Sequence, residues 1–113
     1  MIGLFIHLFD ISLFNEFALY CSIIDIFFPN NIILFNLEDT EINKLFTKYV
    51  IKIKFPNAHI IYTENKGVDI GALFNQIRYI RKNNIKLSWI IKIHTKKDES
   101  WRSSLILPLL SIN

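Results

Sequence analysis

Two short polar segments carry residue types that can bind a phosphorylated ligand. The first, Glu64 to Gly71, reads Glu-Asn-Lys-Gly-Val-Asp-Ile-Gly and joins a predicted strand to a predicted helix. Gly67 allows a positive φ, and unpaired N–H groups at a helix start favour an anion. The spacing is not that of a GxGxxG dinucleotide motif, so Asn65 and Asp69 also have ordinary interpretations as a turn residue and a helix cap.

The second polar segment, Lys92 to Arg102, begins as a predicted strand and continues into a basic loop. His94 is a candidate general base near neutral pH, Lys96 a point charge for a diphosphate, and Arg102 a bidentate phosphate clamp. The alternative is a basic loop whose acidic residues begin a further helix. Neither segment alone decides between ligand binding and a structural role.

Basic residues are concentrated in the last third of the chain. Residues 75–113 carry 8 Lys and Arg against 2 Asp and Glu, whereas residues 1–74 carry 5 against 8. Such a charge distribution attracts a phosphate-bearing ligand, a nucleic acid or an anionic membrane. Because the basic residues form no dense stripe, a nucleic-acid-binding module that stacks bases on Trp89 and Trp101 ranks last among our hypotheses.

Several functional classes lose support from the sequence. No His, Cys, Asp and Glu set has metal-ligand spacing, and no nucleophile elbow or Walker loop occurs. The longest apolar stretch, Phe17 to Phe28, is too short to span a bilayer, and no secretory signal is visible. Cys21, His7 and His59 lie in apolar surroundings and are interpreted as structural. We therefore expect a cytoplasmic protein without a transmembrane segment and without a required cofactor, a divalent metal being compatible but not implied.

Strands and helices alternate around the two polar segments. Apolar β-rich runs predict strands, and apolar residues at helical spacing predict helices. The predicted strands are residues 2–9, 31–37, 58–63 and 89–94, and the predicted helices are residues 13–28, 41–54 and 69–83. Parallel strands need crossovers of this length. The pattern predicts one domain over residues 1–113, a Rossmann-like three-layer α/β fold whose four parallel strands alternate with helices.

Apolar residues at helical spacing predict an apolar face on each of the last two helices. That of the second helix consists of Ile42, Leu45, Phe46, Tyr49, Val50 and Ile53. That of the third consists of Ile70, Leu73, Phe74, Ile77 and Ile80. The apolar run from Ser103 to Leu110 predicts the start of a further helix with little after it to bury it.

The polar loops should meet at one edge of the sheet. Ligands of open parallel sheets bind beyond the carboxyl ends of the strands. Here those ends are Leu8 to Asp10, Leu37 to Thr40, Thr63 to Asp69 and His94 to Asp98. Both polar segments therefore belong to the same predicted site.

In this order the two polar segments match a pair of motifs. Phe55-Pro56-Asn57-Ala58 leads into the first segment, and Trp89 to Thr95 is followed by Lys96, Lys97, Trp101 and Arg102. This arrangement resembles the rhamnan synthesis protein F family, which carries an Asn-x-Gly-x-Asp-Ile loop and a Lys-x-His-Thr-Lys strand end followed by Trp-Arg. The resemblance covers residues 55–105 well and the first half of the chain only in pattern.

The resemblance implies a glycosyltransferase-like protein of polysaccharide assembly. Its fold would be similar to the nucleotide-binding half of a GT-A-type enzyme. The implied nucleotide-sugar-binding residues are Asn65, Gly67, Asp69, Thr95, Lys97 and Arg102. The implied catalytic residues are His94 and Lys96, which stand where many such enzymes place an Asp-x-Asp metal motif. A cationic loop can do part of the metal's work by neutralising a departing diphosphate.

Length is the departure from the family, whose members have a second half that binds the acceptor. We therefore expect a truncated domain that is a rhamnosyltransferase-like enzyme if complete or complemented by a partner. The alternative is a catalytically inactive remnant or a partner-dependent subunit. The expected donor is a nucleotide-diphosphate sugar, with deoxythymidine-diphosphate rhamnose as a candidate, and the expected acceptor is a glycan or polysaccharide. Self-association through the terminal apolar run is a further expectation.

Overall fold

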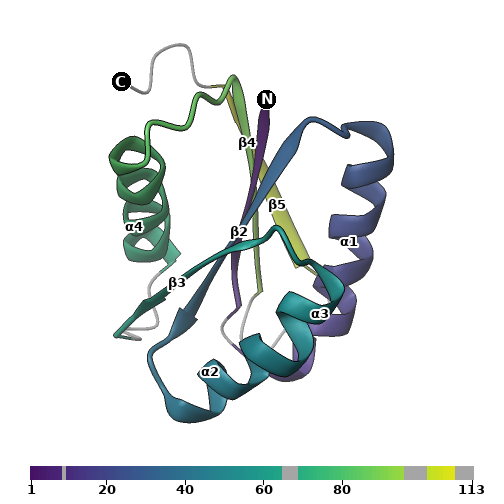
Figure 1. Ribbon diagram of the computed structural model, residues 1–113. Helices are drawn as coiled ribbons and strands as arrows, with labels where there is room; N and C mark the ends of the chain where they lie inside the picture. The colour runs from purple at the N-terminus through teal and green to yellow at the C-terminus, as the bar shows by residue number, and fades with distance from the viewer. Residues whose placement is uncertain (9, 65–68, 96–101, 109–113) are drawn as a thin grey trace.

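The computed structural model describes residues 1–8, 10–64, 69–95 and 102–108 (Figure 1), and for residues 69, 70, 94, 95 and 102–108 the description is confined to the backbone. In chain order the elements are β1 (Ile2–His7), η1 (Ile11–Leu13), α1 (Phe14–Phe27), β2 (Asn31–Glu38), α2 (Glu41–Phe46), η2 (Thr47–Ile51), α3 (Lys52–Lys54), β3 (His59–Thr63), α4 (Asp69–Lys82), β4 (Trp89–Thr95) and β5 (Arg102–Pro108). The predicted alternation of strands and helices up to β4 is confirmed.

The strands form one sheet in the order β3-β2-β1-β4-β5. β1 pairs in parallel with β2 and β4, and β2 pairs in parallel with β3. The chain thus moves outward from β1 to β3 and then crosses back to β4 on the other side of β1. This is a small α/β domain with the four parallel strands and the order reversal of Rossmann-like sheets.

The prediction of a helix beginning at Ser103 is wrong. That segment forms β5, which pairs antiparallel with β4 from Thr95↔Arg102 to Trp89↔Pro108. A short apolar run bounded by Pro fits a strand as well as a helix, and the open edge of β4 offers backbone partners that a helix would not use. The sheet is therefore mixed, with four parallel strands and one antiparallel edge strand.

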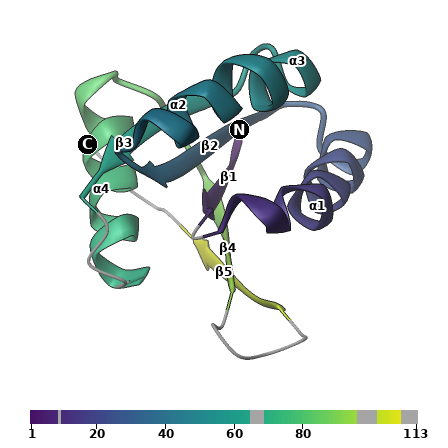
Figure 2. The same ribbon diagram turned by 90° about the horizontal axis from the view of Figure 1, so that it is seen from below.

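Helices cover both faces of the sheet. α1 and the continuous α2–η2–α3 segment lie on one face, and α4 lies on the other (Figures 1 and 2). The first face buries a core that includes Leu4, Ile6, Phe17, Phe35 and Ile51. The α4 side buries a second core that includes Phe5, Ile32, Leu34, Ile80 and Ile90. Successive residues of β1 alternate between the two cores, as strand geometry requires.

Local signals explain where the helices begin and end. The Asp10 side chain accepts a hydrogen bond from the Ser12 N–H at 2.9 Å, which caps the turn that leads into α1. Thr40 caps α2 in the same way by accepting from Asn43 N–H at 3.1 Å. α4 is followed by Asn84, whose φ of 54° is the left-handed conformation common after helix ends.

The predicted apolar face of the second helix is divided between core and surface. Phe46 and Val50 pack against the core. Ile42, Tyr49 and Ile53 are 68%, 63% and 74% exposed, and Leu45 is also exposed. Because η2 is a π-helical stretch, it turns less per residue than an α-helix and alters which residues share a face. The inner face accordingly takes in Thr47 and Ile51, which are buried.

The predicted apolar face of α4 contains one error. Leu73, Ile77 and Ile80 pack in the α4-side core as expected. Phe74 is 60% exposed, whereas Gln76 is fully buried. The helix therefore presents an amide to the sheet. Among the described residues, no helix is long and apolar enough to cross a membrane.

Candidate ligand-binding edge of the sheet

The strand order reverses between β1 and β4, so their carboxyl ends lie side by side. Ile6 pairs with Ile93, and the next residues along these strands are His7 and His94. The chain after β1 stays beside β2, since Leu8 N–H donates to the Asn36 carbonyl at 3.0 Å. In open parallel sheets this reversal point is where ligands bind.

Four of the eight predicted site residues have backbone positions at this edge. Asp69 begins α4, and His94 and Thr95 end β4. Arg102 begins β5 and pairs with Thr95. The antiparallel pairing brings Arg102 beside Thr95, which the sequence did not predict. The other four predicted residues, Asn65, Gly67, Lys96 and Lys97, lie outside the described residues.

A layer of polar side chains, buried except for the partly buried Thr63, lies between the carboxyl half of the sheet and α4. We call it the polar layer, and its members are His7, Asn36, Thr63, Gln76 and Lys92. Phe5, Leu34 and Ile90 belong to the α4-side core, and alternation along each strand directs His7, Asn36 and Lys92 to the same side. Asn36 and Gln76 have no exposed surface, and Lys92 is 3% exposed.

Gln76 bridges two strands from α4. Its Nε2 donates to the carbonyl oxygens of Ile6 at 3.2 Å and Leu34 at 3.3 Å. Because both acceptors are carbonyls, the orientation of the amide is determined: the nitrogen must face the sheet and Oε1 must face away from these two oxygens. Gln76 thus links α4 to β1 just before its carboxyl end and to the middle of β2.

Two polar atoms of this layer lack a hydrogen-bond partner among the described residues: Asn36 Nδ2 and Gln76 Oε1. Asn36 Oδ1, by contrast, accepts from the Thr63 hydroxyl at 3.0 Å. Most buried polar atoms in proteins are paired, and an unpaired one costs roughly 1–3 kcal/mol. Among the described residues, the layer therefore contains one buried donor and one buried acceptor that are not satisfied.

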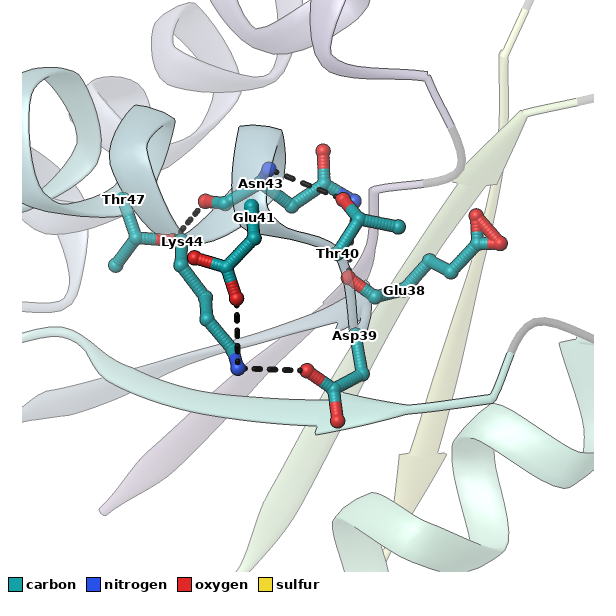
Figure 3. Close-up of polar contacts among 7 residues, drawn as sticks. All are labelled: Glu38, Asp39, Thr40, Glu41, Asn43, Lys44 and Thr47. Atoms are coloured by element: carbon teal, nitrogen blue, oxygen red, sulfur yellow. Dashed lines mark hydrogen bonds and ion pairs between the residues drawn. The ribbon is translucent and has the colours of Figure 1, made fainter.

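The β2–α2 turn is held by its own hydrogen bonds (Figure 3). Asn43 Nδ2 donates to the Glu38 carbonyl at 2.9 Å. Lys44 Nζ lies 3.1 Å from the Asp39 carboxylate and 3.7 Å from Glu41. The hydrogen bond and the charge of Asp39 raise the pKa of Lys44 above its ordinary value, although an exposed pair such as this adds little stability. The turn is a structured rim of the candidate site.

Glu38 is a candidate site residue that sequence reasoning missed. Its side chain points away from the Lys44 group (Figure 3), while Lys44 engages Asp39. An acidic residue following the second strand of a Rossmann-like sheet can accept hydrogen bonds from ribose hydroxyls. The sequence placed Glu38 within Leu37 to Thr40, one of the predicted strand ends, but no motif there gave it a role of its own.

Cys21 and His59 take structural positions, as predicted. Cys21 is fully buried, and burial raises the pKa of its thiol to about 12, so it is not a reactive thiolate. His59 Nδ1 lies 2.7 Å from the Tyr79 hydroxyl, and the rings pack edge to face.

A cavity of about 560 Å³ opens beside His59, at the amino edge of the sheet. It contains none of the predicted site residues.

Comparisons of the chain with known protein families, curated proteins and solved structures find no match. Within the part of the chain that the structure describes, no three His, Cys, Asp or Glu side chains are grouped as they would be to hold a metal ion. The fold shows that the chain is a small α/β domain with a parallel sheet compatible with the Rossmann-like class. The function of the site has to be inferred from the residues at its edge.

Proposed function

We propose that the chain is a glycosyltransferase-like domain that binds a nucleotide-diphosphate sugar at the carboxyl edge of its sheet, as the nucleotide-binding half of a GT-A-type enzyme does. The observation that carries the proposal is the meeting of the β1 and β4 ends beside a buried polar layer. A site at the order reversal suits a nucleotide. Asp69 of the first motif begins α4, and His94 and Thr95 of the second motif end β4, at this same edge.

The proposal assigns the nucleoside and phosphates to different parts of the edge. Asn65, Gly67 and Asp69 hold the nucleoside beside the start of α4. Glu38 accepts hydrogen bonds from the ribose. Thr95, Lys97 and Arg102 hold the diphosphate, where positive charge is needed to offset two phosphates. The acidic turn after β2 and the cationic side chains Lys96, Lys97 and Arg102 are thus suited to opposite ends of one ligand.

His94 and Lys96 are the proposed catalytic residues. Lys96 neutralises the departing diphosphate, and His94 donates or accepts a hydrogen bond at the reacting end. Deoxythymidine-diphosphate rhamnose is the candidate donor, and a second polypeptide or segment presents the glycan acceptor. Under this proposal the domain binds the donor by itself, while transfer depends on the acceptor-binding part.

The test is a titration of the domain with nucleotide-diphosphate sugars and free nucleotides, followed by chemical shifts. Asp69→Ala and His94→Ala should each weaken saturable binding by about tenfold or more, since a charge-assisted contact contributes roughly 1.5–3 kcal/mol. Lys86→Ala is the matched control, because Lys86 is exposed and precedes β4 at the opposite edge. No binding by a folded wild-type protein would refute the proposal.

Metal dependence is tested in the same titration. Lys96→Ala should lose donor binding, and EDTA should leave the binding of the wild-type protein unchanged. A strict Mn²⁺ requirement in the wild-type protein would contradict the assignment of the metal's role to Lys96.

A further inference from the structure

The two helical segments on one face of the sheet have apolar outer surfaces. On α1 the exposed apolar residues include Ile26 at 74% and Phe27 at 72% exposure. On α2–η2–α3 they recur every three or four residues. We call the combined surface the apolar helix face; its residues are Leu19, Ile23, Ile26, Phe27, Ile42, Leu45, Tyr49 and Ile53. The two segments cover the same side of the sheet (Figures 1 and 2).

Of the large apolar residues exposed in the described part of the chain, all but Met1, Phe28, Phe74 and Trp89 lie on these two segments. α1 is apolar on its inner side, where Phe14, Phe17, Ala18 and Cys21 are buried, and again on its outer side. A helix that is apolar all round is normally buried on both sides. Large exposed apolar patches on soluble domains mark interaction sites. The opposite layer lacks this property, because α4 exposes a single large apolar residue, Phe74, among those the structure describes.

Charge distinguishes the two halves of the apolar helix face. α1 contains Glu16 and Asp25 and no lysine or arginine. The α2–η2–α3 segment contains four lysines at positions 44, 48, 52 and 54 against Glu41. Lys44 pairs with Asp39 and Glu41, and Lys52 Nζ donates to the Ala58 carbonyl at 2.7 Å, so Lys48 and Lys54 are the lysines left for an interface. One half is thus acidic and the other basic. A surface that pairs acidic with basic helices favours a partner with the reverse arrangement, whereas an anionic bilayer would repel the α1 half.

A second copy of the same chain has that reverse arrangement. We propose that the apolar helix face is a homodimer interface in which α1 of one copy packs against α2–η2–α3 of the other. A two-fold axis running along the helices brings both such contacts together, so the interface is self-complementary. The apolar residues form its centre and the lysines and carboxylates its rim, as in typical protein interfaces.

The proposed dimer leaves the candidate ligand site open. α1 and the α2–η2–α3 segment lie on the side of the sheet opposite α4 (Figure 2). Gln76 of the polar layer, by contrast, reaches the sheet from α4. The inference therefore does not depend on the proposed nucleotide-sugar function. Dimerisation and ligand binding can fail separately, and different variants report on each.

The experiment measures sedimentation equilibrium of the wild-type chain and of charge variants on each half. Ile23→Lys places a cation on α1 opposite the lysines of the partner, and Tyr49→Glu places an anion on η2 opposite the acidic α1. Each variant alone should raise the dimer dissociation constant by at least about tenfold, as expected for a central interface residue. Phe74→Lys, on α4, is the matched control and should dimerise like the wild type.

Mixing the two charge variants gives the sharper result. If α1 packs against the partner's α2–η2–α3, an Ile23→Lys chain and a Tyr49→Glu chain form a heterodimer with one opposite-charge contact and one unchanged contact. Recovery of dimer in the mixture, with native circular dichroism for each variant, supports the proposal. A wild-type chain that stays monomeric up to its solubility limit overturns it. So does a monomer that binds phosphatidylserine vesicles through Ile26, with binding lost in Ile26→Lys.

Discussion

Replacing Gln76 with leucine should leave the stability of the domain almost unchanged. The substitution removes two hydrogen bonds from Nε2, at 3.2 and 3.3 Å, that lie at the long end of the normal range. Together they contribute roughly 1–2 kcal/mol. The same substitution removes Oε1, a buried acceptor without a partner among the described residues, and so recovers a comparable cost of roughly 1–3 kcal/mol. The two effects nearly cancel.

Two companion variants at this position make the prediction testable by urea denaturation. Gln76→Ala loses the same bonds and also leaves a cavity beneath α4, so it should destabilise the domain by roughly 2–4 kcal/mol. Gln76→Glu should be worse at neutral pH, because it buries a carboxylate beside the carbonyls of Ile6 and Leu34. If Gln76→Leu costs as much as Gln76→Ala, then Oε1 has a partner and the reasoning is wrong.

The remaining predictions concern three other positions. Thr40→Ala should cost about 1 kcal/mol of unfolding free energy in urea, while Thr40→Ser should cost little, because the hydroxyl that accepts from Asn43 N–H is kept. Cys21 should resist iodoacetamide in the native protein and react on unfolding, and rapid native labelling would contradict its burial. Burial first and Lys52 second lower the pKa of His59 below 6.5, so unfolding free energy should fall as pH drops below 6.5. His59→Gln should reduce that fall. If the variant has the same pH profile as the wild type, His59 is not the cause of the fall.

The layered α/β fold could be predicted because its signals are local. Runs of β-branched and aromatic residues, caps at Asp10 and Thr40 and breaks at prolines locate the elements from β1 to β4. The strand formed by Ser103 to Pro108 could not be predicted in this way. A short apolar run has no decisive period, and it became β5 because β4 had an open edge. That edge exists only once the strand order is known.

The sequence predicted the loops of the candidate site but not the buried polar layer beside them. The loops that follow β3 and β4 are visible as polar breaks between apolar elements. The polar layer is less visible, since Asn36 and Gln76 look like solvent-facing residues within otherwise apolar patterns. Their burial depends on α4 lying over β1 and β2, which is a long-range contact. The same limit explains why Ile42 and Ile53 were assigned to the same apolar face as Phe46.

On both faces of the sheet the domain departs from the usual arrangement, in which apolar side chains are buried and polar side chains are exposed. The two departures have different physical consequences. Under α4, two buried polar atoms have no hydrogen-bond partner among the described residues, which costs stability and is typical of a site that binds a ligand. On the outer surface of α1 and α2–η2–α3, apolar side chains meet water, which is typical of a surface that binds another protein. Ligand should therefore stabilise the domain without changing its association, and charge variants of the apolar helix face should change association without changing ligand affinity.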